Sequence, residues 1–464
     1  MLRQLAILLC FLASVHFACA ALIPNGLFVD GAVLQQGRAI PVWGVAGEGE
    51  RVTVRLEGHE VSTVARGGKW SVNLPPMNAG GPFTLTMTGE NQVTAKDVWV
   101  GEVWICGGQS NMERVLGPQP PQKPIEGWQE EVAKADYPRL RQFQVPRVIP
   151  STGEPVDVRG RWVACSPQTA ATFSAVGYAF GRDLQRNRGV AVGLIACNWG
   201  GTPAEAWMSR ETLAADPELR DLLTRLKPVP VQGKPNPTMP CILHESMLAP
   251  LQPYAIRGVI WYQGEANCRN AAQYRRLFPV LIGDWRKAWG QGDFPFLFVQ
   301  LAPYLGNTPE LREAQLLTRR SVPATAMVVT TDLGDADDIH PTRKLPVGER
   351  LALAARAVAY GEPLVYAGPA FTGATFADGL ATLRFEHVGG GLVAKEGPLR
   401  GFQLAGADGI FAEASAEIRG NTVVVRSAAV SDPIAVRYGW ANVPDVNLYN
   451  REGLPASPFR SDCR

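Results

Sequence analysis

The chain has 464 residues, of which 46% are hydrophobic and 19% charged, so it is long enough for two or three domains with their own cores. Its 45 basic and 43 acidic side chains leave a formal net charge of +2. That balance excludes the strongly basic surface with which proteins bind nucleic acids or anionic membranes. The 48 glycines and 37 prolines are typical of a chain with many strands and turns, and exclude a coiled coil or a helix bundle.

The first twenty residues predict a cleaved signal peptide. Arg3 supplies the basic start, an apolar core follows, and Ala18-Cys19-Ala20 forms a cleavage site of small residues. The apolar core is shorter than the roughly 20 residues that span a bilayer. We therefore expect a secreted or periplasmic protein with no membrane span, and the sequence leaves open whether it is soluble or lipid-anchored at Cys19.

The chain has eight cysteines, two of which lie in the predicted signal peptide. The six others allow 15 disulfide pairings, among which the sequence does not choose. Cys106 and Cys197 end apolar, strand-like runs, so buried free thiols are the alternative. No two cysteines have C-x-x-C spacing, and we expect no metal site.

The pattern of apolar and polar residues along the chain predicts three domains after the signal peptide (1–20). Residues 21–98 alternate apolar and polar positions and predict an N-terminal β-sandwich-like domain. Residues 99–365 alternate continuous apolar runs with helical patterns, which predicts an α/β domain, and a proline-rich insertion near 114–170 reads as a loop or lid. Residues 366–464 return to the strand pattern and predict a C-terminal β domain.

Within the α/β domain, the continuous apolar runs predict a parallel sheet covered by helices on both faces. The pattern predicts helices over 271–289, 309–320 and 347–360. Ligands of such sheets bind at the carboxyl ends of the strands. Residues that directly follow the predicted strands are therefore the candidates for chemistry.

Ser110 follows the predicted strand VWVGEVWICGG and is preceded by glycines. A serine at such a turn can combine a nucleophilic hydroxyl with nearby backbone N–H donors. An ordinary helix-capping serine is the alternative. The pattern is not the G-x-S-x-G elbow, because Met112 stands at its last glycine.

The best candidate base is His340, which follows the predicted strand AMVVTTDLG. Asp337 lies three residues before it, so that one tight turn can bring the carboxylate to the imidazole and fix its tautomer. Asp338 is the competing carboxylate, and His244 is a weaker candidate base. An acidic surface loop with an incidental histidine remains the alternative for this segment.

Two further strand ends offer hydrogen-bond donors for a reacting oxygen. Gly200 and Gly201 follow VAVGLIACNW, and glycine lets a backbone N–H approach closely. Gln263 and Glu265 follow RGVIWY, where Gln263 offers an amide and Glu265 a carboxylate. The tryptophans nearest these motifs could stack on sugar rings or pack in the core: Trp199, Trp207 and Trp261.

Together, the motifs GQSNM, NWGGTPAEAW, WYQGEAN and DIHPTRK, in this order, resemble the sialate O-acetylesterase family of SGNH-type hydrolases. The resemblance extends over most of the chain beyond the signal peptide. It implies a flavodoxin-like α/β domain with attached β domains, no cofactor or metal, and an O-acetylated carbohydrate substrate. Sialic acid is the first expectation, and acetylxylan or another polysaccharide the alternative.

Carried over by position, the resemblance implies roles for individual residues. Ser110 would be the nucleophile, and His340 and Asp337 would complete the triad. The backbone of Ser110, that of Gly201 (or of Gly200) and the side chain of Gln263 would form the oxyanion hole. Four further residues are predicted to bind substrate: Trp207, Asn111, Glu265 and Asn267. One departure from the family, His244-Glu245-Ser246-Met247 in place of an Asn-Gly pair, leaves the substrate open.

Two other functions compete with the esterase. A glycosidase could use Glu265 with Glu205 or Asp337 as paired carboxylates, but this would leave Ser110 and His340 without a role. A non-catalytic protein could bind polysaccharide through its β domains and tryptophans. The sequence does not decide the oligomeric state.

Overall fold

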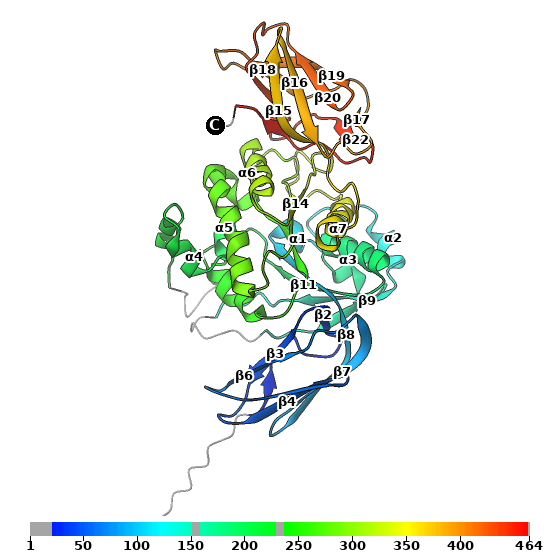
Figure 1. The fold of residues 1–464 in the computed structure, drawn as a ribbon, viewed down its shortest axis with the longest axis vertical. Coiled ribbons are helices and arrows are strands. Elements are labelled where there is room, and N and C mark those ends of the chain that lie inside the picture. The colour runs from blue at the N-terminus through cyan, green and yellow to red at the C-terminus, as the bar shows by residue number, and fades with distance from the viewer. Residues whose placement is uncertain (1–20, 151–157, 229–235, 463–464) are drawn as a thin grey trace, which may run out of the picture.

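The computed structural model describes residues 21–150, 158–228 and 236–462. They form three bodies stacked along the long axis, with the N-terminal strands at one end and the C-terminal strands at the other (Figure 1). The predicted signal peptide lies outside the described residues. No helix in the described ranges is long and apolar enough to cross a membrane.

The N-terminal body is built from mainly antiparallel strands, as the alternating pattern predicted, and only β2 among the described strands pairs in parallel, with β8. Its strands are β1 (Ile23–Pro24), β2 (Val33–Gln35), β3 (Ile40–Val45), β4 (Arg51–Leu56), β5 (His59–Val64), β6 (Lys69–Leu74), β7 (Gly80–Thr88) and the first part of β8 (Gln92–Gly108). β1, β3 and β6 form a separate three-stranded sheet. β8 continues without a break into the central body, so the predicted boundary between residues 98 and 99 falls inside one strand.

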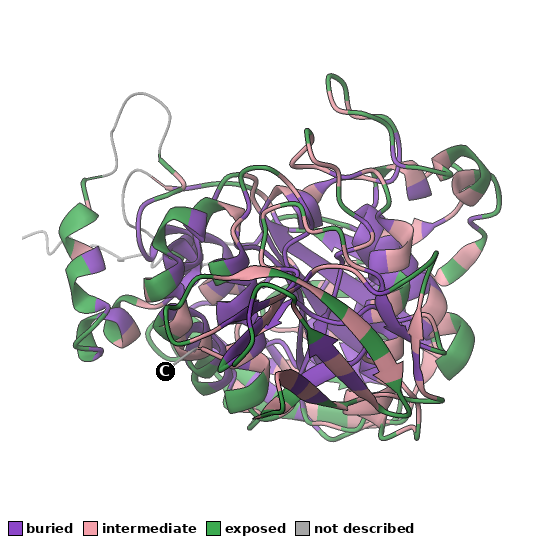
Figure 2. Ribbon diagram, turned by 90° about the horizontal axis from the view of Figure 1, so that it is seen from above, coloured by how far each residue is buried: buried purple, intermediate pink, exposed green. Residues whose placement is uncertain are grey.

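The central body holds a mainly parallel sheet in the order β10-β9-β11-β8-β12-β13-β14, in which only β10 is antiparallel to its neighbour. The strands that follow β8 are β9 (Tyr137–Gln144), β10 (Trp162–Cys165), β11 (Ala191–Asn198), β12 (Gly258–Tyr262), β13 (Phe296–Val299) and β14 (Thr325–Val328). Its helices are α1 (Ser110–Glu113), α2 (Trp128–Ala133), α3 (Ala175–Arg188), α4 (Arg210–Ala215), α5 (Ala271–Trp289), α6 (Pro309–Ser321) and α7 (Leu345–Tyr360). Buried residues are concentrated in this body (Figure 2).

The structure confirms the three helices that periodicity predicted in this body, because each buries one apolar face. The stretch 114–170, which the sequence predicts as an insertion or lid, has regular structure of its own. This stretch supplies β9, which pairs in parallel with β11, and also β10 and α2.

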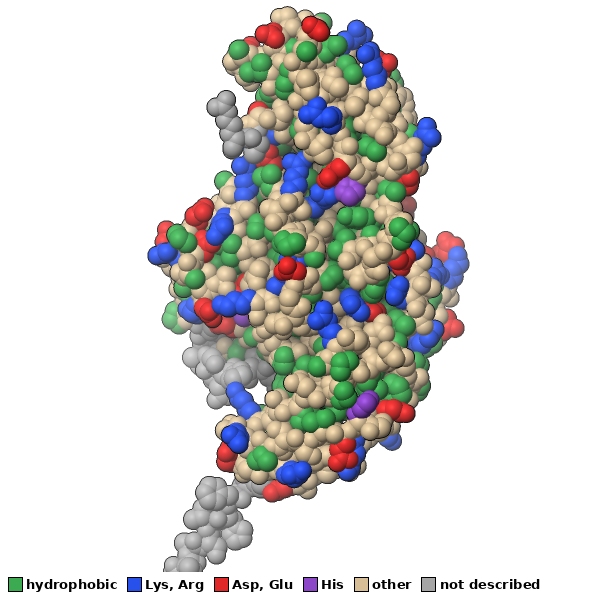
Figure 3. Space-filling model, in the orientation of Figure 1, with side chains coloured by type: hydrophobic (Ala, Val, Ile, Leu, Met, Phe, Trp, Pro, Cys, Tyr) green, Lys and Arg blue, Asp and Glu red, His purple; other side chains and the backbone are tan. Residues whose placement is uncertain are grey.

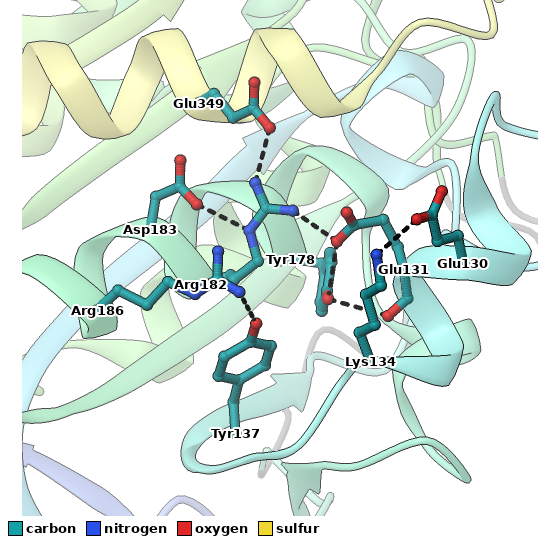
Figure 4. Close-up of polar contacts among 9 residues, drawn as sticks. All are labelled: Glu130, Glu131, Lys134, Tyr137, Tyr178, Arg182, Asp183, Arg186 and Glu349. Carbon is teal, nitrogen blue, oxygen red and sulfur yellow. Dashed lines mark hydrogen bonds and ion pairs between the residues drawn. The ribbon is translucent and has the colours of Figure 1, made fainter.

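A buried arginine fixes α2 to the two helices beside it. Arg182 on α3 donates to Glu131 on α2 at 2.5 Å, to Asp183 at 2.8 Å and to Glu349 on α7 at 2.7 Å (Figure 4). Three carboxylates around one guanidinium that is 6% exposed bind far more firmly than a surface ion pair. This part of the predicted insertion is therefore anchored to the body.

The C-terminal body is antiparallel. Its strands are β15 (Ala370–Ala377), β16 (Leu380–Glu386), β17 (Leu392–Ala394), β18 (Phe402–Ala405), β19 (Ala412–Arg419), β20 (Thr422–Arg426), β21 (Ala435–Tyr438), β22 (Leu448–Asn450) and β23 (Phe459–Arg460). Seven of them form one sheet, while β17 and β22 pair separately. This body packs on α6 and on the loop after β13, through contacts such as Arg460 to Glu313 and Asn442 to Leu305.

Candidate active site

Ser110 lies where the central strand β8 ends and α1 begins, and β8 has β11 on one side and β12 on the other. Gly108 makes this turn possible. Its φ is +131°, and an added Cβ would lie 2.2 Å from the carbonyl oxygen of Tyr262, so only glycine fits. The turn presents a half-buried Ser110 at the carboxyl edge of the sheet. The helix α1, which Ser110 begins, lies within the central body (Figure 1).

His340 reaches the same edge on the loop that follows β14. The Asn111 side-chain amide donates to the carbonyl oxygen of Ile339 at 3.0 Å, so the residue after Ser110 is bonded to the residue before His340. His340 is half-buried. No hydrogen bond joins the Ser110 hydroxyl to the His340 ring in the described structure, and apo enzymes often hold such pairs apart until substrate binds.

The two aspartates before His340 differ in their contacts. Asp338 Oδ1 accepts the backbone N–H of His340 at 2.8 Å, and Lys123 lies 3.8 Å from the same carboxylate. Asp337 is exposed, and its own N–H donates to Asp335. Within the described residues, neither carboxylate bonds to the His340 ring.

Positive charge surrounds His340. Burial, together with the charges of Lys344 and Arg114, lowers its pKa from the ordinary 6.5, while Asp338 opposes the shift. A lowered pKa keeps the imidazole neutral, which is the form that can accept a proton from a serine. His340 is therefore suited to act as a base near neutral pH.

The second predicted glycine motif lies against Ser110. A Cβ added to Gly200 would come 3.3 Å from the Ser110 Cβ. The N–H of Gly200 donates to the carboxylate of Glu113 and is not free. Gly201 has φ of +75°, and neither its N–H nor that of Ser110 has an acceptor in the described ranges, which leaves two backbone donors at the turn.

Gln263 is fully buried behind this turn. Its side-chain amide nitrogen donates to Asn267 Oδ1 at 2.7 Å and to the backbone carbonyl of Thr202 at 3.3 Å. Its side-chain oxygen accepts from the Tyr274 hydroxyl. Both of its N–H groups are thus engaged in this conformation. The longer contact to Thr202 is the weaker of the two.

Three of the four predicted substrate-binding residues are buried in this structure. Trp207 has no exposed surface and packs edge-on against Trp261. Asn267 is 2% exposed and bonds to Glu205, and Asn111 is 1% exposed. Their side chains support the floor of the site and offer no face to a sugar.

Two of the three carboxylates that a glycosidase could use are engaged in hydrogen bonds, and the third, Asp337, is exposed. Glu205 is 2% exposed and is bound by Arg225 and Asn267, whereas the half-buried Glu265 accepts from Asn111. This arrangement gives no support to paired carboxylates facing a scissile bond. The described residues contain no group of three or more His, Cys, Asp or Glu side chains that could hold a metal ion.

Two buried cations near the site were not predicted. Arg114 is 1% exposed and donates to Gln122 and to the carbonyl of Lys123. Lys344 is fully buried and donates to Asn111 Oδ1 at 2.7 Å. Their places were the only signal in the sequence: Arg114 lies two residues after the GQSNM motif, and Lys344 is the last residue of DIHPTRK.

This site combines a strand-end serine, a histidine on a neighbouring loop and two backbone N–H groups without acceptors in the described ranges, which are the kinds of group that ester hydrolysis can use. Residues 100–357 match the family model described as "Carbohydrate esterase, sialic acid-specific acetylesterase". The chain belongs to this family and is a carboxylic ester hydrolase.

Curated relatives and a solved structure agree with that assignment. Sialate O-acetylesterases from Rattus norvegicus and Homo sapiens are each 33% identical to the chain; both alignments cover 77% of it, and 76% and 74% of the relatives. The crystal structure of a carbohydrate acetylesterase from Xanthomonas citri is 40% identical, with a TM-score of 0.86. That alignment covers 95% of this chain and 100% of the other.

Proposed function

We propose that this protein is a serine esterase that removes O-acetyl groups from a carbohydrate, with O-acetylated sialic acid as its first substrate. The observation that carries the proposal is the bond from Asn111 to Ile339, because it places the Ser110 turn beside the His340 loop. The names of the relatives support acetyl transfer from a carbohydrate. Acetylxylan or another acetylated polysaccharide is the alternative substrate.

The reaction follows from the chemistry of these groups. His340 accepts the Ser110 hydroxyl proton while the Ser110 oxygen attacks the acetyl carbonyl carbon. The tetrahedral intermediate then collapses, the sugar oxygen leaves with the proton from His340, and an acetyl-serine remains. A water molecule, deprotonated by His340, attacks this ester and releases acetate and free Ser110.

The oxyanion of the intermediate needs preorganised donors. The N–H groups of Ser110 and Gly201 are free to serve, and we assign them this role. Gln263 is the proposed third donor, which requires its 3.3 Å contact to Thr202 to give way when substrate binds. Each such donor typically contributes about 100-fold or more to turnover.

Asp337 is the proposed acid of the triad. Asp338 is bound to the backbone N–H of His340, whereas Asp337 has a side chain free to turn toward the ring. Its carboxylate would hold the His340 tautomer and stabilise the imidazolium.

The finer fold assignment is part of the same proposal. The order β11-β8-β12-β13-β14 corresponds to 2-1-3-4-5 in chain order, which is that of flavodoxin-like sheets. We assign the central body to the flavodoxin-like SGNH hydrolases, and the two antiparallel bodies to attached sandwich-like domains. Ligands of such sheets bind where the order reverses, which is at β8 and therefore at Ser110.

Secretion is a separate proposal, carried by residues 1–20. We infer that cleavage after Ala20 releases the protein to the periplasm or the medium. An intact mass that corresponds to a chain beginning at Ala21 in the secreted fraction would support this, and an uncleaved cytoplasmic protein would overturn it.

One face of the molecule carries acidic and basic side chains interspersed over all three bodies, as suits a protein surface in water (Figure 3).

The test is acetate release from p-nitrophenyl acetate, O-acetylated sialic acid and acetylated xylan. Wild type is compared with Ser110→Ala, and with Ser71→Ala as a matched control at an exposed serine on β6. We expect release by wild type and by the control but not by Ser110→Ala, and the preferred carbohydrate identifies the substrate. No release from any of the three by wild type would overturn the proposal.

A further inference from the structure

Asn111 forms hydrogen bonds to three different segments of the site. Its amide donates to Glu265 and to the carbonyl of Ile339, and its carbonyl oxygen accepts from Lys344. We call these four residues the Asn111 bridge. The bridge joins the turn of Ser110, the segment after β12 and the His340 loop at one residue on each side of the histidine.

The chemistry of the partners fixes the orientation of the Asn111 amide. Ile339 offers a carbonyl and Glu265 a carboxylate, which only accept, so they require the amide nitrogen. The ammonium of Lys344 only donates, so it requires the amide oxygen. A flipped amide would lose all three bonds, so Lys344 helps to fix the orientation together with Ile339 and Glu265.

The bridge is buried and carries charge. Lys344 is fully buried at the start of α7, and its Nζ lies 5.6 Å from the centre of the Tyr262 ring. Glu265, Asp338 and Arg114 are the other charged groups that act on it. Burial lowers the pKa of Lys344 to about 7 although Glu265 opposes the shift, and burial raises the pKa of Glu265.

We propose that Lys344 is a positioning residue that, through Asn111, holds the Ser110 turn in register with the His340 loop. The inference rests on the proposed function and adds a residue that the reaction itself does not touch. A fully buried lysine is rare because burial of its charge is costly, and here the charge serves a contact between the two halves of the machinery. Loss of this contact lets Ser110 and His340 drift apart, and a displacement near 1 Å can cost about 100-fold in rate.

The Lys344 charge also reaches His340. After burial, it is the largest influence that lowers the pKa of His340. Removal of this charge must therefore raise the pKa of His340. A purely structural role for Lys344 would not move the titration of His340 in this direction.

The test measures kcat, KM and the pH dependence of kcat/KM for Lys344→Met, with the exposed neighbour Arg343→Met as matched control. For Lys344→Met we expect kcat to fall about 10- to 100-fold with little change in KM, and the acidic limb to move to higher pH. Arg343→Met should keep the wild-type kcat and limb. A wild-type kcat, or an unmoved limb in a folded Lys344→Met protein, would overturn the inference.

A second variant protects the test against misfolding. Lys344→Met with Glu265→Gln removes both charges, and the glutamine carbonyl can still accept from Asn111. We expect this double variant to fold and to keep the acidic limb of its pH profile at the higher pH of Lys344→Met. Its loss of kcat should be smaller than the losses of Lys344→Met and Glu265→Gln combined. The inference alone fails if wild type hydrolyses p-nitrophenyl acetate in a Ser110-dependent way but the double variant keeps the wild-type acidic limb of the pH profile. If wild type shows no such hydrolysis, the proposed function fails as well.

Discussion

The backbone N–H of His340 donates to Asp338 Oδ1 at 2.8 Å. The two residues therefore form a local turn within the His340 loop. Aspartate commonly forms this turn, because its short side chain reaches the amide two residues on. The contact occupies Asp338 with the backbone. We propose that Asp337, whose side chain is exposed, is the carboxylate that turns toward the imidazole ring.

We therefore predict different effects for the two aspartates. Asp337→Asn should lower kcat by about 100- to 10,000-fold, because an amide holds the wrong imidazole tautomer and does not stabilise the imidazolium. Asp338→Asn should keep most of the activity, because an asparagine side-chain oxygen can still accept the backbone N–H. Steady-state kinetics on an aryl acetate check this, and the reverse order of effects would assign the catalytic carboxylate to Asp338.

The pKa of His340 predicts the acidic limb of the pH profile. Burial and neighbouring cations lower this pKa from 6.5, and the base must be neutral to work. Activity should therefore rise with pH through a midpoint below 6.5 and be fully developed at neutral pH. Measurement of kcat/KM across this range reports the free enzyme, and a midpoint well above 6.5 would contradict the environment described for His340.

Arg312, within the LREAQ stretch, is predicted to hold the C-terminal body onto the central one. This fully buried guanidinium donates to the carbonyls of Leu301 and Ala302 on one side and of Ala441 and Asn442 on the other. Arg312→Met would remove this donor from the carbonyls of Leu301, Ala441 and Asn442, whereas the Ala302 carbonyl keeps its bond from Asn307. We expect a loss of about 3 kcal/mol in the free energy of unfolding, since each unpaired buried group costs roughly 1–3 kcal/mol.

Chemical denaturation measures this loss, with Arg384→Met as the control. Arg384 is an exposed arginine of β16 that donates to Thr375, and its loss should change stability by less than about 0.5 kcal/mol. Equal stability of the two variants would show that Arg312 does not secure the two bodies.

The five cysteines among the described residues are all free and buried: Cys106, Cys165, Cys197, Cys241 and Cys268. Of the two alternatives for Cys106 and Cys197, a disulfide or a buried free thiol, the structure shows the free thiol. Burial raises the pKa of Cys165 to about 12, far from the thiolate form that reacts. An excess of dithiothreitol should therefore leave the thermal midpoint unchanged. A clear fall in the midpoint under reduction would reveal a disulfide that stabilises the fold.

The sequence predicted Ser110 and His340 as neighbours because parallel strands deliver their following loops to one edge of a sheet. It did not predict that Trp207 and Asn267, which follow other strands of the same sheet, would be buried. Strand-end position fixes where a residue starts and not the direction of its side chain. The burial of Lys344 was not predicted for a related reason. A single lysine in a loop is ordinarily exposed, and here its burial depends on Asn111 and Glu265, which are far away in the sequence.

The same contrast holds for the fold. α5 and α6 were predictable because a helix records its buried face in a local period of 3.6 residues. The 17-residue β8 was not recognised as one strand, because its two halves face different bodies and its pattern changes from alternating to continuous. β9 was missed because its pairing with β11 depends on residues about fifty positions away.

The central claim is that Ser110 is the nucleophile and His340 its base, and covalent labelling tests it most directly. Wild type, Ser110→Ala and His340→Ala are treated with a fluorophosphonate, and the modified peptide is located by mass spectrometry. We predict a single adduct on Ser110 in wild type, none in Ser110→Ala, and labelling slowed by at least about 100-fold in His340→Ala. An adduct on another residue, or acetate release that persists in Ser110→Ala, would contradict this account.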